Sequence, residues 1–216
     1  MAARERVEHW DAVYRDGDPE RHSWFQVVPE ASMAMIERAG LVRGDAVLDV
    51  GAGNSLLAGL LARRGFRVTA LDVSARAIEL ARHRVAAGAD AIEWVVADFL
   101  AWEPMRRFRL VHDRAAFHFL VDSRDRLVYV ERLRAVLDPG GHVVLTTFAP
   151  DGPPSCSGLA VARYGPDELV DVLGPGFRLE DHRRETHRTP AGREQRFTSI
   201  RACLADPDGA PVSEAF

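Results

Sequence analysis

The sequence contains no lysine, since all 28 of its Lys and Arg residues are arginine. Lysine is the residue that forms Schiff bases, binds phosphates in a P-loop and serves as an amine base, so these three chemistries are excluded. Cysteine occurs only at positions 156 and 203. Two cysteines do not make a disulfide framework, and no His or Cys spacing predicts a metal site. We therefore expect reduced thiols and no bound metal.

A strong charge of one sign and a long apolar run are also missing. The formal net charge is −4, which gives no sign of the basic face that a nucleic-acid backbone requires. There is no apolar run of about 18 residues and no charged start followed by a short apolar region. We expect a cytoplasmic protein without nucleic-acid or membrane partners. A length of 216 residues with 47% hydrophobic residues suits a single domain.

A strand followed by a glycine loop organises the rest of the chain. Residues 46–50 are an apolar run of the kind that forms a strand buried on both faces of a parallel sheet. Gly51 and Gly53 free the backbone for a tight turn and for close approach of a ligand. Residues 56–64 continue with helical periodicity. This strand, loop and helix predict a cofactor-binding unit.

An aspartate stands at or just beyond the end of each of the first strands: Asp49, Asp72 and Asp98. The predicted strands 46–50, 67–71 and 92–97 alternate with helices, which indicates a doubly wound α/β sheet with ligands at the carboxyl ends of its strands. We therefore expect the three carboxylates to lie along one edge. A dinucleotide fingerprint needs a third small residue in the loop, but that position is Leu56.

The stretches 49–53, 71–74 and 97–99 resemble the first three motifs of class I S-adenosylmethionine (SAM) methyltransferases. The resemblance implies a Rossmann-like, seven-stranded mixed sheet whose last strands are antiparallel. It also implies SAM as cofactor and S-adenosylhomocysteine as product. Asp49 is expected at the methionine amino group, Asp72 at the ribose hydroxyls and Asp98 at the adenine amine. Other roles stay open, because Asp49 can accept backbone N–H groups of the loop and Asp98 can cap a helix. The expected cofactor contacts are Asp49, Gly51, Ala52, Gly53, Asp72, Val73, Asp98 and Phe99.

The remaining elements follow from periodicity and turn residues. Residues 149–165 form a long loop of the kind that carries function, and a turn at 189–192 joins the last two strands into an antiparallel hairpin. We expect one methyltransferase domain over 1–204, with a helical lid at 1–40, a core at 41–204 and a disordered tail at 205–216. The other predicted helices cover 4–15, 30–39, 75–85, 124–137 and 167–173, and the other predicted strands cover 108–113, 142–148, 177–186 and 194–204.

Aromatic residues are concentrated near the N-terminus. Trp10 and Tyr14 lie on one face of the first predicted helix, and Trp24 and Phe25 follow it. In a class I methyltransferase this segment lies over the cofactor mouth, which implies that Trp10, Tyr14 and Trp24 contact the cofactor. The alternative is that these side chains only anchor the first helix to the sheet.

The acceptor site is expected after strand 108–113. Enzymes that methylate amino nitrogens of bases or amides carry an Asn/Asp-Pro-Pro-aromatic signature there, and this sequence has none. Residues 113–116 and 152–154 instead resemble the thiopurine and thiol methyltransferase subgroup. This implies a small-molecule acceptor, a thiol or a metalloid. The alternatives are a protein lysine methyltransferase and a catalytically silent SAM-binding protein. Oligomeric state cannot be read from these patterns.

Three residues are the candidates for catalysis: Asp113, Arg114 and His118. His118 is either a base with a near-neutral pKa or a histidine in the cleft wall. Arg114 either clamps an anionic substrate or pairs with an acid, with Asp113, Asp122 and Glu103 as the expected partners. Asp113 either touches the methionine amine or the substrate, or it caps the following helix.

Two further residues near the acceptor region carry chemistry. His112 ends the same strand as Asp113, and Cys156 lies in the long loop between prolines and serines. Cys156 either binds a soft metalloid near the thioether or is an inert thiol. A thiolate or a metalloid oxyanion is already deprotonated, so the need for a general base depends on the acceptor.

Overall fold

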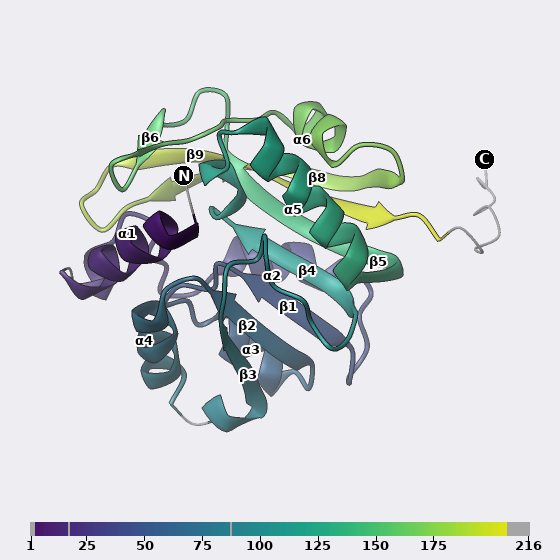
Figure 1. Ribbon diagram of the computed structural model, residues 1–216, viewed down its shortest axis with the longest axis horizontal. Helices are drawn as coiled ribbons and strands as arrows, with labels where there is room; N and C mark the ends of the chain where they lie inside the picture. The colour runs from purple at the N-terminus through teal and green to yellow at the C-terminus, as the bar shows by residue number, and fades with distance from the viewer. Residues whose placement is uncertain (1–2, 17, 87, 207–216) are drawn as a thin grey trace.

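The computed structural model describes residues 3–16, 18–86 and 88–206. Within these residues, seven strands form one sheet in the order β3-β2-β1-β4-β5-β9-β8 (Figure 1). Strands β1 to β5 run parallel to one another, and β9 runs antiparallel to both β5 and β8. This confirms the predicted doubly wound mixed sheet. The strands are β1 Ala46–Val50, β2 Arg67–Asp72, β3 Ile92–Val96, β4 Phe108–Arg114, β5 Leu137–Phe148, β8 Phe177–Arg188 and β9 Glu194–Leu204.

Helices cover both faces of the sheet because the strands are apolar on both faces. Val47 packs in a cluster with residues of α2 and α3, whereas Leu48 packs in a second cluster with residues of α5 and α6. Neighbouring residues of a strand point to opposite faces, so β1 lies at the centre of a three-layer sandwich. The helices are α1 Ala3–Arg15, α2 Glu30–Glu37, α3 Leu57–Arg63, α4 Ala75–Val85, α5 Ser123–Val136 and α6 Pro166–Leu173.

Local sequence signals place several boundaries where they were predicted. β1 covers 46–50, and α4 covers 75–85 with the Ser74 side chain accepting the backbone N–H of Ala77. Two predictions were wrong. β5 begins at Leu137 rather than at 142, directly after α5. The loop 149–165 holds a small hairpin of β6 (Ser155–Cys156) and β7 (Leu159–Ala160), because Ser157 and Gly158 adopt the positive φ angles of 51° and 78° that a two-residue hairpin turn requires.

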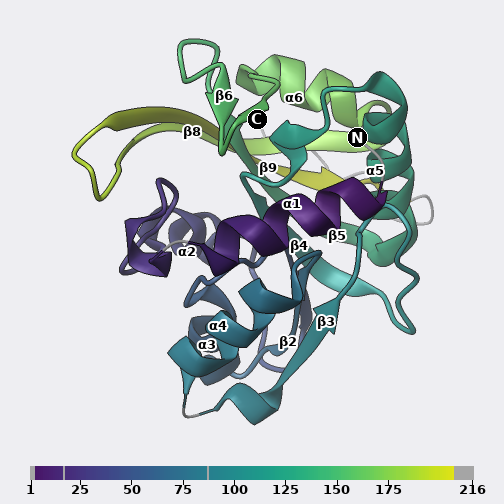
Figure 2. The same ribbon diagram turned by 60° about the vertical axis from the view of Figure 1, so that its left-hand side comes forward.

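The first helix, α1, lies across the carboxyl ends of the parallel strands (Figure 2). Asp11 accepts a hydrogen bond of 2.5 Å from the Ser74 hydroxyl, and Arg6 pairs with Asp98 at 2.6 Å. These contacts fasten α1 to the segments that follow β2 and β3. The predicted tail falls mostly on residues 207–216, which lie outside the described part of the chain. Among the helices that the structure describes, none is long and apolar enough to cross a bilayer.

Candidate active site

The glycine loop after β1 packs closely against two other segments, the turn after β4 and helix α1. Gly51 and Gly53 have φ angles of +65° and +54°, a region that favours glycine. A Cβ on Gly51 would lie 2.6 Å from the Cβ of Ala116, and a Cβ on Gly53 would lie 2.6 Å from the Tyr14 hydroxyl. The turn after β4 and helix α1 therefore both approach the loop at positions where only glycine fits.

Asp72 connects this loop to the end of β2. Its carboxylate accepts the backbone N–H of Gly53 at 2.8 Å and that of Ser74 at 2.9 Å. Burial, with a smaller contribution from the charge of Asp49, raises the pKa of Asp72 to about 6. The side chain also lines the main cavity.

Asp49 is held by a histidine rather than by the loop. One carboxylate oxygen lies 2.7 Å from Nδ1 of His112, whose Nε2 lies 2.9 Å from the Ser32 hydroxyl in α2. The other oxygen, Oδ2, has no hydrogen-bond partner among the described residues, and Asp49 lines a smaller cavity of about 60 Å³. The second role predicted for Asp49, accepting backbone N–H groups of the glycine loop alongside contact with the cofactor, was therefore wrong. Its unpartnered oxygen is suited to an ammonium group.

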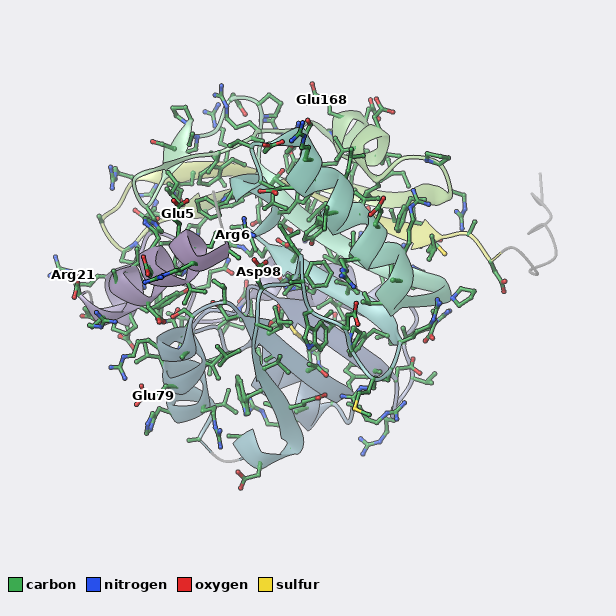
Figure 3. The ribbon with its side chains drawn as sticks, in the orientation of Figure 1. Glu5, Arg6, Arg21, Glu79, Asp98 and Glu168 are labelled. Carbon is green, nitrogen blue, oxygen red and sulfur yellow. The ribbon has the colours of Figure 1, made fainter. Side chains whose placement is uncertain are left out.

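Asp98 faces the first helix. Oδ1 accepts the backbone N–H of Leu100 at 3.1 Å within a turn, while Oδ2 accepts two hydrogen bonds from Arg6. No helix lies between β3 and β4 among the described residues, so the alternative that Asp98 caps a helix was wrong. Figure 3 shows Arg6 and Asp98 reaching toward each other from α1 and from the segment after β3. Arg6 also lies 3.4 Å from Asp125. Sequence reasoning missed Arg6, although its spacing of four from Trp10 and of eight from Tyr14 places all three on one helix face.

The main cavity has a volume of about 250 Å³ and runs from these acids into an aromatic region. Trp10, Tyr14 and Trp24 all line it. They also pack on one another, with ring centroids of Trp10 and Trp24 6.0 Å apart, so lining and anchoring are compatible. Val73 and Phe99 line the cavity as well, while Ala52 and Gly53 line the smaller one and Gly51 lines both. Several lining residues were not predicted, among them Phe119, Phe148, Leu159, Ala160, Gln195 and Phe197.

Asp113 is buried and does not line either cavity. Its carboxylate accepts the backbone N–H groups of Ala116 at 3.0 Å and Phe117 at 3.1 Å, and the Tyr129 hydroxyl at 2.7 Å. Burial raises its pKa to about 6. The geometry therefore favours the capping role over contact with cofactor or substrate. Asp113 fixes the turn that carries its neighbours, in which Ala115 has a φ of 66°.

Arg114 lies where the two cavities meet, since it lines both. Its guanidinium stacks on Phe197 at 4.6 Å, donates one hydrogen bond of 3.4 Å to the carbonyl of Trp24 and lies 3.8 Å from Glu185. The expected partners Asp113, Asp122 and Glu103 were therefore wrong. Glu185 comes from β8, far along the chain, which is why spacing could not identify it. Burial lowers the pKa of Arg114.

His118 is buried in the wall of the main cavity. Its Nδ1 accepts the backbone N–H of Phe148 at 3.3 Å. Burial, helped by the charge of Arg114, lowers the pKa of His118 to about 3. The prediction of a base with a near-neutral pKa was therefore wrong, and His118 is neutral at physiological pH.

The cysteines lie in different places. Cys156 lines the main cavity, with its sulfur 3.9 Å from the Ser23 hydroxyl and 3.8 Å from the Ser157 hydroxyl. Cys203 is brought together with His142 and Glu180, with potential ligand atoms within 4.8 Å of one another. The sequence did not predict this grouping, because it joins three strands. Arg178 and Arg201 already pair with Glu180, and their positive charge opposes binding of a cation there.

Comparison with known proteins agrees with this geometry. Residues 47–141 match the family described as a methyltransferase domain. The matched segment covers less than half of the chain and contains the glycine loop together with Asp49, Asp72 and Asp98.

Among similar proteins, an uncharacterized methyltransferase of Mycobacterium tuberculosis is 41% identical over 103 residues, which is 47% of this chain and 50% of that protein. The chain thus spans about half the length of this relative. The EEF1A lysine methyltransferase 2 of Danio rerio is 29% identical over 80% of this chain and 75% of its own length. A solved structure, described as "Conversion of a Disulfide Bond into a Thioacetal Group during Echinomycin Biosynthesis", has a TM-score of 0.73 and 27% identity, covering 93% of this chain and 94% of that chain.

Proposed function

We propose that the domain transfers the methyl group of SAM to a small-molecule acceptor, with sulfur as the nucleophile. The observation that carries the proposal is the cavity, which continues from Asp72 and Asp98 past the glycine loop into a region walled by Phe148 and Phe197. Methyl transfer is an in-line displacement, so the protein must hold the nucleophile about 3 Å from the methyl carbon. A single continuous cavity that holds both the methyl donor and the acceptor allows this alignment.

The cofactor is proposed to lie along the carboxyl edge of the sheet. Asp72 accepts the ribose hydroxyls, Asp98 accepts the adenine amine, and the unpartnered oxygen of Asp49 accepts the methionine ammonium. Trp10 and Tyr14 of α1 close this edge, so residues 1–40 act as the proposed lid. The bound cofactor supplies an activated methyl group on a sulfonium.

Sulfur is favoured over other nucleophiles by two observations. The similar solved structure concerns a disulfide and a thioacetal, and that likeness extends over 93% of this chain. The second observation is that the cavity wall contains His118 as a neutral side chain with a pKa of about 3, which is a poor base. A thiolate needs no base, because it is deprotonated before it attacks.

A lysine side chain of a protein is the second candidate. It is favoured by the relative from Danio rerio, which is similar over 80% of this chain. A lysine reaches such a site as an ammonium ion and must lose a proton first. The buried guanidinium of Arg114 lines the cavity and disfavours an ammonium ion placed directly beside it.

The test is methyl transfer from radiolabelled SAM to a panel of aromatic thiols, aliphatic thiols, tellurite and lysine peptides. Label in a thiol product, lost in Asp72→Ala, is the expected result. Label in lysine peptides alone would make the second candidate correct. SAM binding without transfer to any member of the panel would favour a catalytically silent SAM-binding protein.

A further inference from the structure

We infer that the acceptor end of the cavity binds an aromatic anion, a thiolate or a phenolate, through Arg114 and the Nε2–H group of His118. This inference rests on the proposed function, because it names the class of acceptor for the same cavity. The polar side chains that carry it belong to residues that line the main cavity together with aromatic rings, and they come from three separate elements: β4, η3 (Phe117–Phe119) and β9.

The first of these atoms belongs to Arg114. Nη1 donates to the Trp24 carbonyl and Nε faces Glu185, but Nη2 has no hydrogen-bond partner in the described part of the chain. A buried guanidinium with an unsatisfied N–H group is costly unless an acceptor reaches it. Because Arg114 lines the main cavity, that acceptor is supplied by a ligand.

The second atom is Nε2 of His118. A neutral histidine has one protonated ring nitrogen, and the nitrogen that accepts a hydrogen bond is the unprotonated one. Nδ1 accepts the Phe148 N–H, so the proton is on Nε2. This N–H group is buried and finds no partner among the residues described. His118 therefore donates a hydrogen bond to a ligand rather than removing a proton from it.

The third polar group is the amide of Gln195, which is 9% exposed and whose Oε1 also lacks a partner in the described structure. Gln195 and Phe197 alternate along β9, so both point to the same side of the strand. The cavity wall thus contains two donor side chains, Arg114 and His118, and one acceptor, Gln195. This set fits an aromatic ring that carries a negatively charged atom at one position and an N–H or O–H group at another. The rings of Trp10, Phe119 and Phe148 supply flat apolar walls for such a molecule.

The charges around the site have an uneven distribution that favours an anion. Glu185 lies near Arg114 but does not line the cavity. Asp122 and Asp125 line it, beside α5, and Asp125 already faces Arg6. Arg114 lies against Phe197 and close enough to His118 to lower its pKa, so the positive charge beside these two residues favours an anion over an ammonium ion.

The experiment measures binding to the full chain saturated with S-adenosylhomocysteine, so that it does not depend on turnover. The probes are thiophenol, as its thiolate at alkaline pH, and benzylammonium, a cation of similar size. We expect thiophenolate to bind about tenfold more tightly or better, the effect of one charge-assisted hydrogen bond. Equal affinity for the two probes would overturn the inference.

Variants assign the effect to the named groups. Arg114→Gln is expected to lose the tenfold preference while its affinity for S-adenosylhomocysteine changes less than about twofold. His118→Phe weakens thiophenolate binding, His118→Gln restores it by supplying an N–H group, and His83→Gln on the exposed face of α4 is the matched control. If Arg114→Gln weakens S-adenosylhomocysteine instead, the guanidinium binds the cofactor and the inference is wrong.

The two proposals fail in different ways. Selective binding of thiophenolate without methyl transfer would refute the proposed function and leave the anion site standing. Methyl transfer to an acceptor, with no preference for the anion over the cation, would refute the anion site and leave the proposed function standing.

Discussion

At the scale of single residues, burial of Asp72 changes the pKa of a carboxylate that we propose binds the cofactor. Its carboxylate holds the backbone N–H of Gly53 and lines the cavity, and burial raises its pKa to about 6. Ribose hydroxyls donate hydrogen bonds, which the ionised carboxylate accepts and the protonated carboxyl accepts less well. We therefore propose that cofactor affinity depends on the charge of this one group.

We predict that the affinity for S-adenosylhomocysteine falls about tenfold when the pH is lowered from 7 to 5, because Asp72 becomes protonated near pH 6. Calorimetric titration across this range measures the change. The Asp72→Asn variant is the control and should bind weakly at both values. An affinity of the wild type that does not vary between these values would contradict the role of the ionised carboxylate.

The same shift has an opposite effect on the unliganded protein. The pKa of Asp72 is raised from 3.8 to about 6 by folding, so the folded state binds the proton more tightly. Its contribution to stability is present below about pH 4 and is lost as the pH rises through 6.

Residues at the site could be predicted from sequence where the chemistry follows a strand end. Asp49, Asp72 and Asp98 were found in this way because parallel strands end at one edge. Their partners were not found, since His112 reaches Asp49 from the neighbouring strand β4 and Arg6 reaches Asp98 from α1. Gln195 was missed because β9 lies far from the motifs along the chain and joins them only through its pairing with β5.

At the scale of elements, the glycine loop depends on two neighbours that press on it. The turn after β4 contacts Gly51, and Tyr14 of α1 contacts Gly53. The hairpin β6–β7 adds Cys156, Leu159 and Ala160 to the cavity. Periodicity predicted the long helices and strands well. It could not predict this hairpin, because its strands are two residues long and depend on the φ angles of the turn.

We predict that Gly51→Ala destabilises the protein by roughly 2–5 kcal/mol and abolishes cofactor binding. The positive φ costs about 1–2 kcal/mol for a residue with a Cβ, and the contact with Ala116 at 2.6 Å adds about 1–3 kcal/mol of overpacking. Urea unfolding measures the change in the free energy of unfolding.

The matched control for Gly51→Ala is Gly192→Ala. Gly192 has a φ of +79°, but no described atom lies within 4 Å of the position that the alanine Cβ would take. This variant should lose about 1–2 kcal/mol and keep its cofactor affinity. Equal losses in the two variants would show that the contact with Ala116 contributes nothing.

At the scale of the whole molecule, one edge of one sheet gathers the functional groups. Asp49 lies near the end of β1, Asp72 ends β2 and Asp98 follows β3, while Arg114 ends β4 and Phe148 ends β5. Helix α1 covers this edge (Figure 2), and Gln195 and Phe197 of β9 line the cavity. The sequence predicted this architecture because it follows from alternating strands and helices. The acceptor wall depends on the long-range placement of β9, which local patterns do not contain.

The most direct test of the central claim is calorimetric titration of the wild-type protein and of Asp72→Ala with SAM. We predict saturable binding to the wild type and a loss of about 100-fold or more in the variant, since two hydrogen bonds to a charged group are removed. Circular dichroism checks that the variant remains folded. Absence of binding to the wild type, or unchanged affinity in a folded Asp72→Ala protein, would contradict the assignment of this cavity to SAM.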